Sequence, residues 1–147
     1  MRRQVKIAAV FLWISLLPAF AASDQTLQQL ETKATTGRPE DRVQTCLEIA
    51  EHQLKAAGEA FKAGNVGEAQ SAVKDVVQYA SKARDAAIQS GKRGKNTEIV
   101  VRKLAAKLRD IKRTVDFADQ APLQTASDEL EKIRTDLLSH MFAKGGK

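Results

Sequence analysis

The sequence has few of the residues that build covalent, metal or nucleotide sites. Among 147 residues there are one cysteine, two histidines, one tryptophan and three prolines. A single thiol excludes a disulfide within the chain, so side-chain packing has to hold the fold. It also excludes the Cys-x-x-Cys-His motif of covalent haem attachment. These absences favour a packed domain without covalent cross-links.

The positions of the histidines and the cysteine exclude the usual catalytic and metal sites of helical proteins. Ferritin-like di-metal sites need Glu-x-x-His on two helices, whereas Ile49 and Leu137 stand three residues before His52 and His140. Cys46 and His52 would lie about 120° apart around a helix, too far for a nucleophile and its base. We therefore predict that the protein is not an enzyme and has no cofactor and no metal.

The first 21 residues have the pattern of a secretory signal peptide. Three basic residues precede an apolar run over 7–17, and Ala19-Phe20-Ala21 supplies the small residues that signal peptidase requires. The run is too short to cross a membrane as a helix. We expect cleavage after Ala21, a periplasmic or secreted protein, and no transmembrane span after cleavage. The alternative is a retained N-terminal anchor.

Cleavage changes the charge and the start of the protein. Three of the 24 basic residues and none of the 18 acidic ones lie in 1–21, so the net charge falls from +6 to +3. The next segment, 22–37, is polar and has Leu27 and Leu30 as its sizeable apolar groups. We predict a flexible polar tether there.

Apolar residues then recur every three or four positions in four successive segments. The segments are 43–61, 66–87, 101–118 and 123–141, and this spacing places the apolar residues on one helix face. Gly64, Gly91 and Pro122 stand where one helix ends or the next begins. No window alternates apolar and polar residues as a strand requires.

These segments predict an all-α fold, an antiparallel up-down helical bundle over 38–143. Short connections make consecutive helices antiparallel, and four segments of similar length indicate four long helices. The alternative is a three-helix bundle with a broken last helix. Residues 144–147 are expected to form a disordered tail.

One junction resembles a known repeat. The stretch GEAFKAGNVGEAQSAV, residues 58–73, is similar to the helix–turn–helix junction of tetratricopeptide repeats, with Gly58, Phe61, Asn65 and Ala69 near the corresponding places. The turn is one residue shorter when measured from Gly58. The flanking helices are too long for a repeat of about 34 residues, and no second copy is present. The resemblance covers this junction alone, so we assign no family from it.

Residues 92–113 form a strongly basic segment. They contain nine basic and two acidic residues, a net charge of +7 against +3 for the cleaved chain. The spacing does not fit a P-loop, and no aromatic residue is present to stack on nucleic-acid bases, so neither is expected. The segment is either a solvated helix face or a surface for an acidic protein or another anionic envelope component. The candidate contacts are Lys92, Arg93, Lys95, Arg102, Lys103 and Arg109.

The functional hypothesis is an exported, non-enzymatic helical bundle that acts as a binding or scaffolding module in the cell envelope. One alternative is a bundle that binds a small ligand or cofactor between its helices. Another is a homo-oligomeric structural protein that self-associates through apolar seam residues and Cys46.

Overall fold

The computed structural model describes residues 21–145, with side chains from residue 27 onward, and this part of the chain is helical without strands. The all-α prediction is therefore confirmed, but there are five α-helices instead of four. The predicted signal peptide lies outside the described residues except for Ala21. The elements are α1 (Ala21–Thr36), α2 (Pro39–Lys62), α3 (Val66–Ser90), α4 (Gly94–Lys112), the 3₁₀ turn η1 (Phe117–Asp119) and α5 (Gln120–Gly145).

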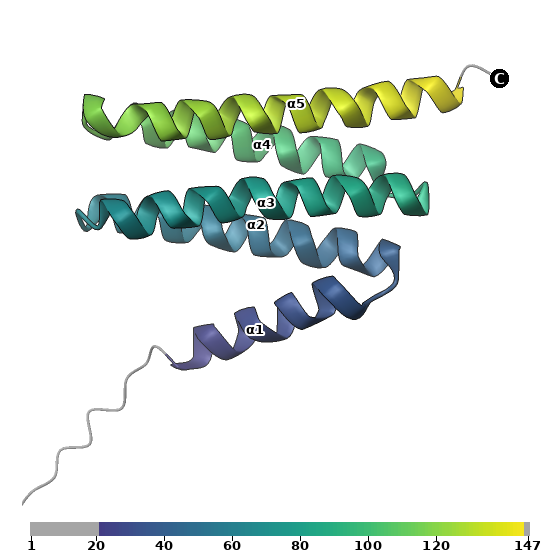
Figure 1. Cartoon of the computed structure of the whole chain (residues 1–147), viewed down its shortest axis with the longest axis horizontal. Helices are drawn as coiled ribbons and strands as arrows, with labels where there is room; N and C mark the ends of the chain where they lie inside the picture. Colours follow the sequence, from purple (N-terminus) through teal and green to yellow (C-terminus); the bar gives the residue numbers. More distant parts are fainter. Residues whose placement is uncertain (1–20, 146–147) are drawn as a thin grey trace, which may run out of the picture.

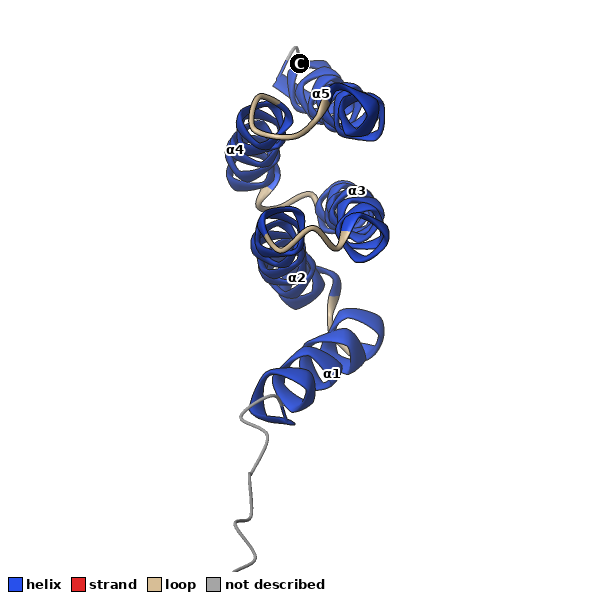
Figure 2. Ribbon diagram, turned by 90° about the vertical axis from the view of Figure 1, so that its left-hand side faces the viewer, coloured by secondary structure: helices blue, strands red, loops and turns tan. Residues whose placement is uncertain are grey.

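The helices form two stacked hairpins with one additional helix at the end. Consecutive helices run antiparallel, as Figure 1 shows. Viewed along the helices, α2 and α4 lie in one layer, α3 and α5 lie in the other, and α1 packs against α2 (Figure 2). The chain thus zigzags between two layers.

The order of neighbours differs from that of a closed up-down bundle. In a closed bundle the last helix returns to the first, whereas here α5 packs beside α3 and α4 packs beside α2. The helix α2 explains the difference because it buries side chains on more than one face, from Val43 to Ala60. It lies between α1, α3 and α4, so the stack stays open.

The segment 22–37 is a helix where the sequence predicts a flexible tether. Ala34 is buried, and Leu27 and Leu30 pack against the core. Threonine hydroxyls also donate to carbonyl groups of the preceding turn, as Thr36 Oγ1 does to Thr32 O at 2.8 Å. These three apolar residues lie where α1 packs against α2. At the other end, α5 continues through Gly145 into the predicted tail.

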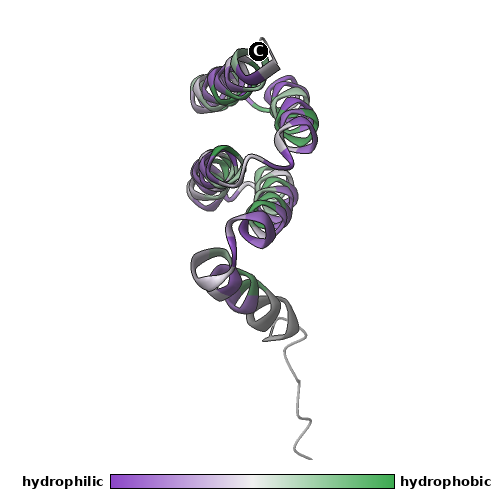
Figure 3. Ribbon diagram, turned by 90° about the vertical axis from the view of Figure 1, so that its right-hand side faces the viewer, coloured by the Kyte–Doolittle hydropathy of each residue, from purple (hydrophilic) through white to green (hydrophobic). Residues whose placement is uncertain are grey.

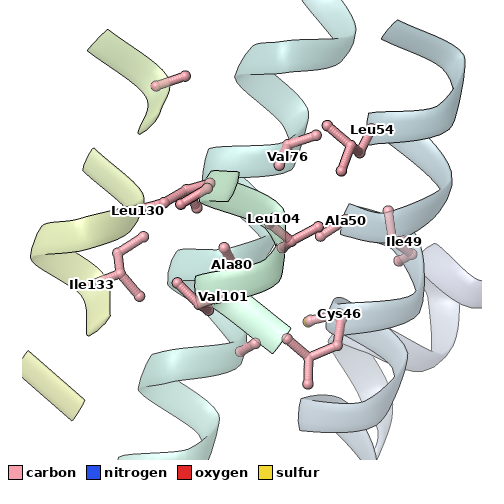
Figure 4. Packing of buried hydrophobic residues seen from close by; sticks show 14 of the residues in the cluster. Cys46, Ile49, Ala50, Leu54, Val76, Ala80, Val101, Leu104, Leu130 and Ile133 are labelled. Atoms are coloured by element: carbon pink, nitrogen blue, oxygen red, sulfur yellow. The ribbon is translucent and has the colours of Figure 1, made fainter. Parts of the chain in front are cut away.

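The core lies between the two layers, where Figure 3 shows the hydrophobic residues gathered. Leu104 reaches from α4 to Ala50 of α2, and Leu130 lies on the facing side of α5 (Figure 4). Ala50 and Leu130 are fully buried and Leu104 almost so. None of the helices in residues 21–145 combines the length and the apolar character that a membrane span needs.

Candidate functional site

The six predicted contact residues do not form one surface. Lys92 and Arg93 lie in the turn between α3 and α4, and the other four lie on α4. Ion pairs engage two of the six: Lys92 Nζ is 2.6 Å from Glu40 Oε1, and Arg109 Nη1 is 3.1 Å from Glu131 Oε1. These two side chains already have acidic partners within the chain, so they contribute less to an external anion site than their charge implies.

The turn between α3 and α4 has a structural role. Gly91 and Arg93 both have left-handed backbone conformations, with φ of 67° and 62°. The Arg93 carbonyl accepts hydrogen bonds from Thr97 N and Thr97 Oγ1, both at 2.9 Å, and so begins α4. Helix α4 therefore starts at Gly94.

The ion pair of Lys92 fastens this turn to the beginning of α2. The hydrogen bond from Lys92 lowers the pKa of Glu40, and the charges of Lys92, Arg38 and Arg93 act in the same direction. Both members of the pair are largely exposed to solvent. Such a pair positions the turn and contributes little to stability.

Arg109 belongs to a set of four charged residues between α4 and α5, which we call the ion ladder. Arg134 Nε donates to Glu98 Oε1 at 2.6 Å, and Arg134 Nη1 donates to Glu131 Oε2 at 3.3 Å. Arg109 Nη1 donates to the other Glu131 oxygen at 3.1 Å, which completes the ladder. Burial opposes ionisation of Glu131, but the hydrogen bonds from the two arginines outweigh it and lower its pKa.

The sequence pattern gives no indication that Glu98, Glu131 and Arg134 form a unit. The (i, i+3) spacing of Glu131 and Arg134 places them on one face of α5, which is the available signal. The basic segment 92–113 predicts Arg109 as a contact residue, but its charge does not indicate which helix packs against it.

The remaining predicted residues point in different directions. Lys95 and Arg102 are exposed on α4 and form no ion pair with a described residue. Lys103 follows Arg102 in sequence and lies about 100° farther around the helix. It lines a groove between α4 and α2.

This groove between α2 and α4 has a volume of about 910 Å³ and an apolar floor. Leu54 and Gly58 of α2 and Leu104 and Ile111 of α4 form the floor. A Cβ atom at Gly58 would lie 3.6 Å from Ile111 Cδ1, an ordinary van der Waals distance, so the position would tolerate a side chain. We call this feature the α2–α4 groove.

Charged residues line both rims of the α2–α4 groove. Two of the three acidic groups have partners within the chain, because Glu59 pairs with Lys55 at 3.9 Å and Asp110 pairs with Arg113 at 3.0 Å. The third acidic residue is Glu51. Three lysines on the rims form no ion pair with a described residue: Lys62, Lys103 and Lys107. The lining as a whole holds four lysines and three acidic residues, so the groove has a net charge of +1.

A second hollow lies on the opposite side of the stack, between α3 and α5, and has a volume of about 550 Å³. Val73, Val77 and Pro122 line it together with one cation, Lys74, and one anion, Glu129. Its charges balance, so it gives less information about a partner than the α2–α4 groove does.

The α2–α4 groove combines apolar side chains with ammonium and carboxylate groups. Within residues 27–145 no group of three or more His, Cys, Asp or Glu side chains is placed to hold a metal ion. An apolar floor beside ammonium groups can bury apolar side chains and attract carboxylates. Of the six residues predicted from sequence, Lys103 alone lies in this groove, and the α2 rim was not predicted.

The comparison with known proteins adds no relative: no protein-family model, curated protein or solved structure matches the chain.

Proposed function

We propose that the protein is an exported, non-enzymatic binding or scaffolding module of the cell envelope that holds a protein partner in the α2–α4 groove. The observation that supports this most is the pairing of an apolar floor with rim lysines that have no ion partner among the described residues. The groove lies between α2 and α4, which form one layer of the open stack.

Export is proposed from the sequence of residues 1–21. Cleavage after Ala21 leaves 22–36 of α1 to dock on α2, together with the four long helices α2 to α5. The functional unit that we propose is therefore the complete stack, including the helix that follows the cleavage site.

The homo-oligomeric alternative through a disulfide has less support. Cys46 is 1% exposed in the core, and burial raises the pKa of its thiol, although the charges of Lys82 and Arg42 partly oppose this. A buried, protonated thiol reacts slowly with a second molecule.

A pair of cross-linking variants tests the proposed function in the cells that produce the protein. A photoreactive amino acid replaces Lys103 in the groove or Arg102 on the outward face of α4. We expect protein cross-links from position 103 and few from position 102. Equal cross-linking from both positions, or none from position 103, contradicts the proposal.

A further inference from the structure

The walls of the α2–α4 groove restrict how a polypeptide can bind there. Both walls are helices, so they present no open strand edge for backbone pairing with an extended peptide. Among the residues that the structure describes, no aromatic side chain lines the groove, although polyproline segments need aromatic surfaces. The mode that remains is a helix that inserts an apolar stripe between α2 and α4.

The dimensions of the groove suit a short helix. The groove follows residues 51–62 of α2, which is about 17 Å of helix. This corresponds to roughly three turns of a partner helix, or apolar side chains at i, i+3 or i+4, and i+7. Gly58 contributes no side chain to the floor, so a side chain introduced there would occupy part of the groove.

The charges on the rims favour particular residues on either side of the apolar stripe of that helix. Lys103 and Lys107 are one turn apart on α4, and Lys62 stands on the α2 rim. Carboxylates on both sides of the apolar stripe would therefore meet an ammonium group on each wall. The chain's own residues 1–20 are basic and apolar, so their charge is unsuitable for this site.

We infer that the α2–α4 groove binds an amphipathic α-helix whose apolar stripe is flanked by acidic residues. This inference rests on the proposed function and adds the chemical class of the partner. The carboxylates give selectivity and faster encounter, and the buried apolar stripe gives most of the affinity.

Designed peptides of about 15 residues test the inference by fluorescence anisotropy with the purified protein. One peptide carries leucines at helical spacing with glutamates on both flanks, and a matched peptide has lysines in place of the glutamates. We expect the acidic peptide to bind about tenfold more tightly, because several exposed ion pairs of a few tenths of a kcal/mol each add to roughly that ratio. Equal affinity, or preference for the basic peptide, overturns the inference.

Two double variants with the same change in charge locate the effect. Lys103→Glu with Lys107→Glu should abolish the preference for the acidic peptide. Lys95→Glu with Arg102→Glu, on the outward face of the same helix, should leave it intact. If both double variants lose the preference for the acidic peptide equally, net charge explains the preference. That result would contradict binding in the α2–α4 groove.

A third variant tests the apolar floor without any change in charge. Gly58→Leu fills the groove near Ile111 and should remove measurable binding of the acidic peptide. Circular dichroism checks that each variant remains helical, and unchanged peptide binding by a folded Gly58→Leu protein contradicts the inference. The two experiments together separate the two proposals. If position 103 cross-links to a protein in cells but the purified protein does not prefer the acidic peptide, the proposed function stands and the acidic helix is rejected. If position 103 gives no cross-links and the acidic peptide is not preferred, both proposals are rejected.

Discussion

The α2–α3 hairpin and the α4–α5 hairpin have the same outline but different contacts. Small apolar residues dominate the first, and fully buried alanines such as Ala57, Ala80 and Ala83 allow a close approach. The second has a leucine core, and the ion ladder crosses its interface. Two antiparallel helix pairs in one chain thus use apolar packing and directional ion pairing to different degrees.

This difference has consequences for how each hairpin responds to its surroundings. Apolar packing is insensitive to pH and is weakened little by moderate salt. The ion ladder fixes the register of α4 against α5, because its hydrogen bonds are directional. It also makes that interface dependent on the ionisation of Glu131. The α2–α4 groove lies between the two kinds of hairpin, because α2 belongs to the apolar one and α4 to the one with the ion ladder.

The largest expected effect comes from a cavity in the apolar hairpin. Ile49 of α2 is fully buried, so Ile49→Ala should lower the free energy of unfolding by about 2–5 kcal/mol. The loss should be the same at low and high salt, because no charge is involved. Urea unfolding followed by circular dichroism measures it, with the exposed Ser71→Ala as the matched control on α3. A strongly salt-dependent loss would contradict the apolar description of this hairpin.

An intermediate effect is expected from the ion ladder. Glu98 is 8% exposed, and Glu98→Ala removes its hydrogen bond with Arg134, at a cost of about 1–3 kcal/mol. The double variant with Glu98→Leu and Arg134→Leu should recover part of the loss, since apolar groups replace both charged partners. Urea unfolding of the wild type, Glu98→Leu, Arg134→Leu and the double variant gives the coupling between the residues. Strictly additive losses would show that the ladder does not act as a unit.

The apolar spacing of the sequence predicts most of the helices but not all of them. The apolar spacing identifies the helices α2 to α5, because each buries a stripe that recurs every three or four residues. It does not identify α1, whose described apolar side chains are too few to distinguish a docked helix from a polar tether. The docking depends on the surface that α2 offers, and the apolar residues of 22–37 alone do not indicate that surface.

The candidate site illustrates the same limit. Lys103 was predicted from local charge, but Lys62 and Leu54 belong to a helix distant in sequence. A helical spacing shows that a face is buried without showing which helix covers it. Here α4 packs beside α2 in an open stack, so the groove arises from an arrangement that the spacing does not determine. The ion ladder was missed for the same reason.

The smallest effect is expected on acidification, and it should have opposite signs in the two hairpins. The folded-state pKa of Glu131 is lowered, so its contribution is present above the ordinary glutamate value of about 4.3 and is lost as pH falls through the lowered value. Burial and then the charge of Glu31 raise the pKa of Asp75 on α3, while Lys82 partly opposes them. Protonation of Asp75 therefore adds stability as pH falls through that raised value, and the gain is complete below the ordinary aspartate value.

Hydrogen exchange at pH values from about 7 down to 3, corrected for the intrinsic exchange rates, should separate the two responses by region. Protection of α4 and α5 should decrease near the acidic end, whereas protection of α1 and α3 should hold or increase. Glu131→Gln should remove the first change and Asp75→Asn the second, because each amide cannot titrate. A parallel loss of protection in both hairpins, unaltered by either variant, would mean that the whole stack responds to acid as one cooperative unit. The contrast between the hairpins would then describe their contacts but not their stability.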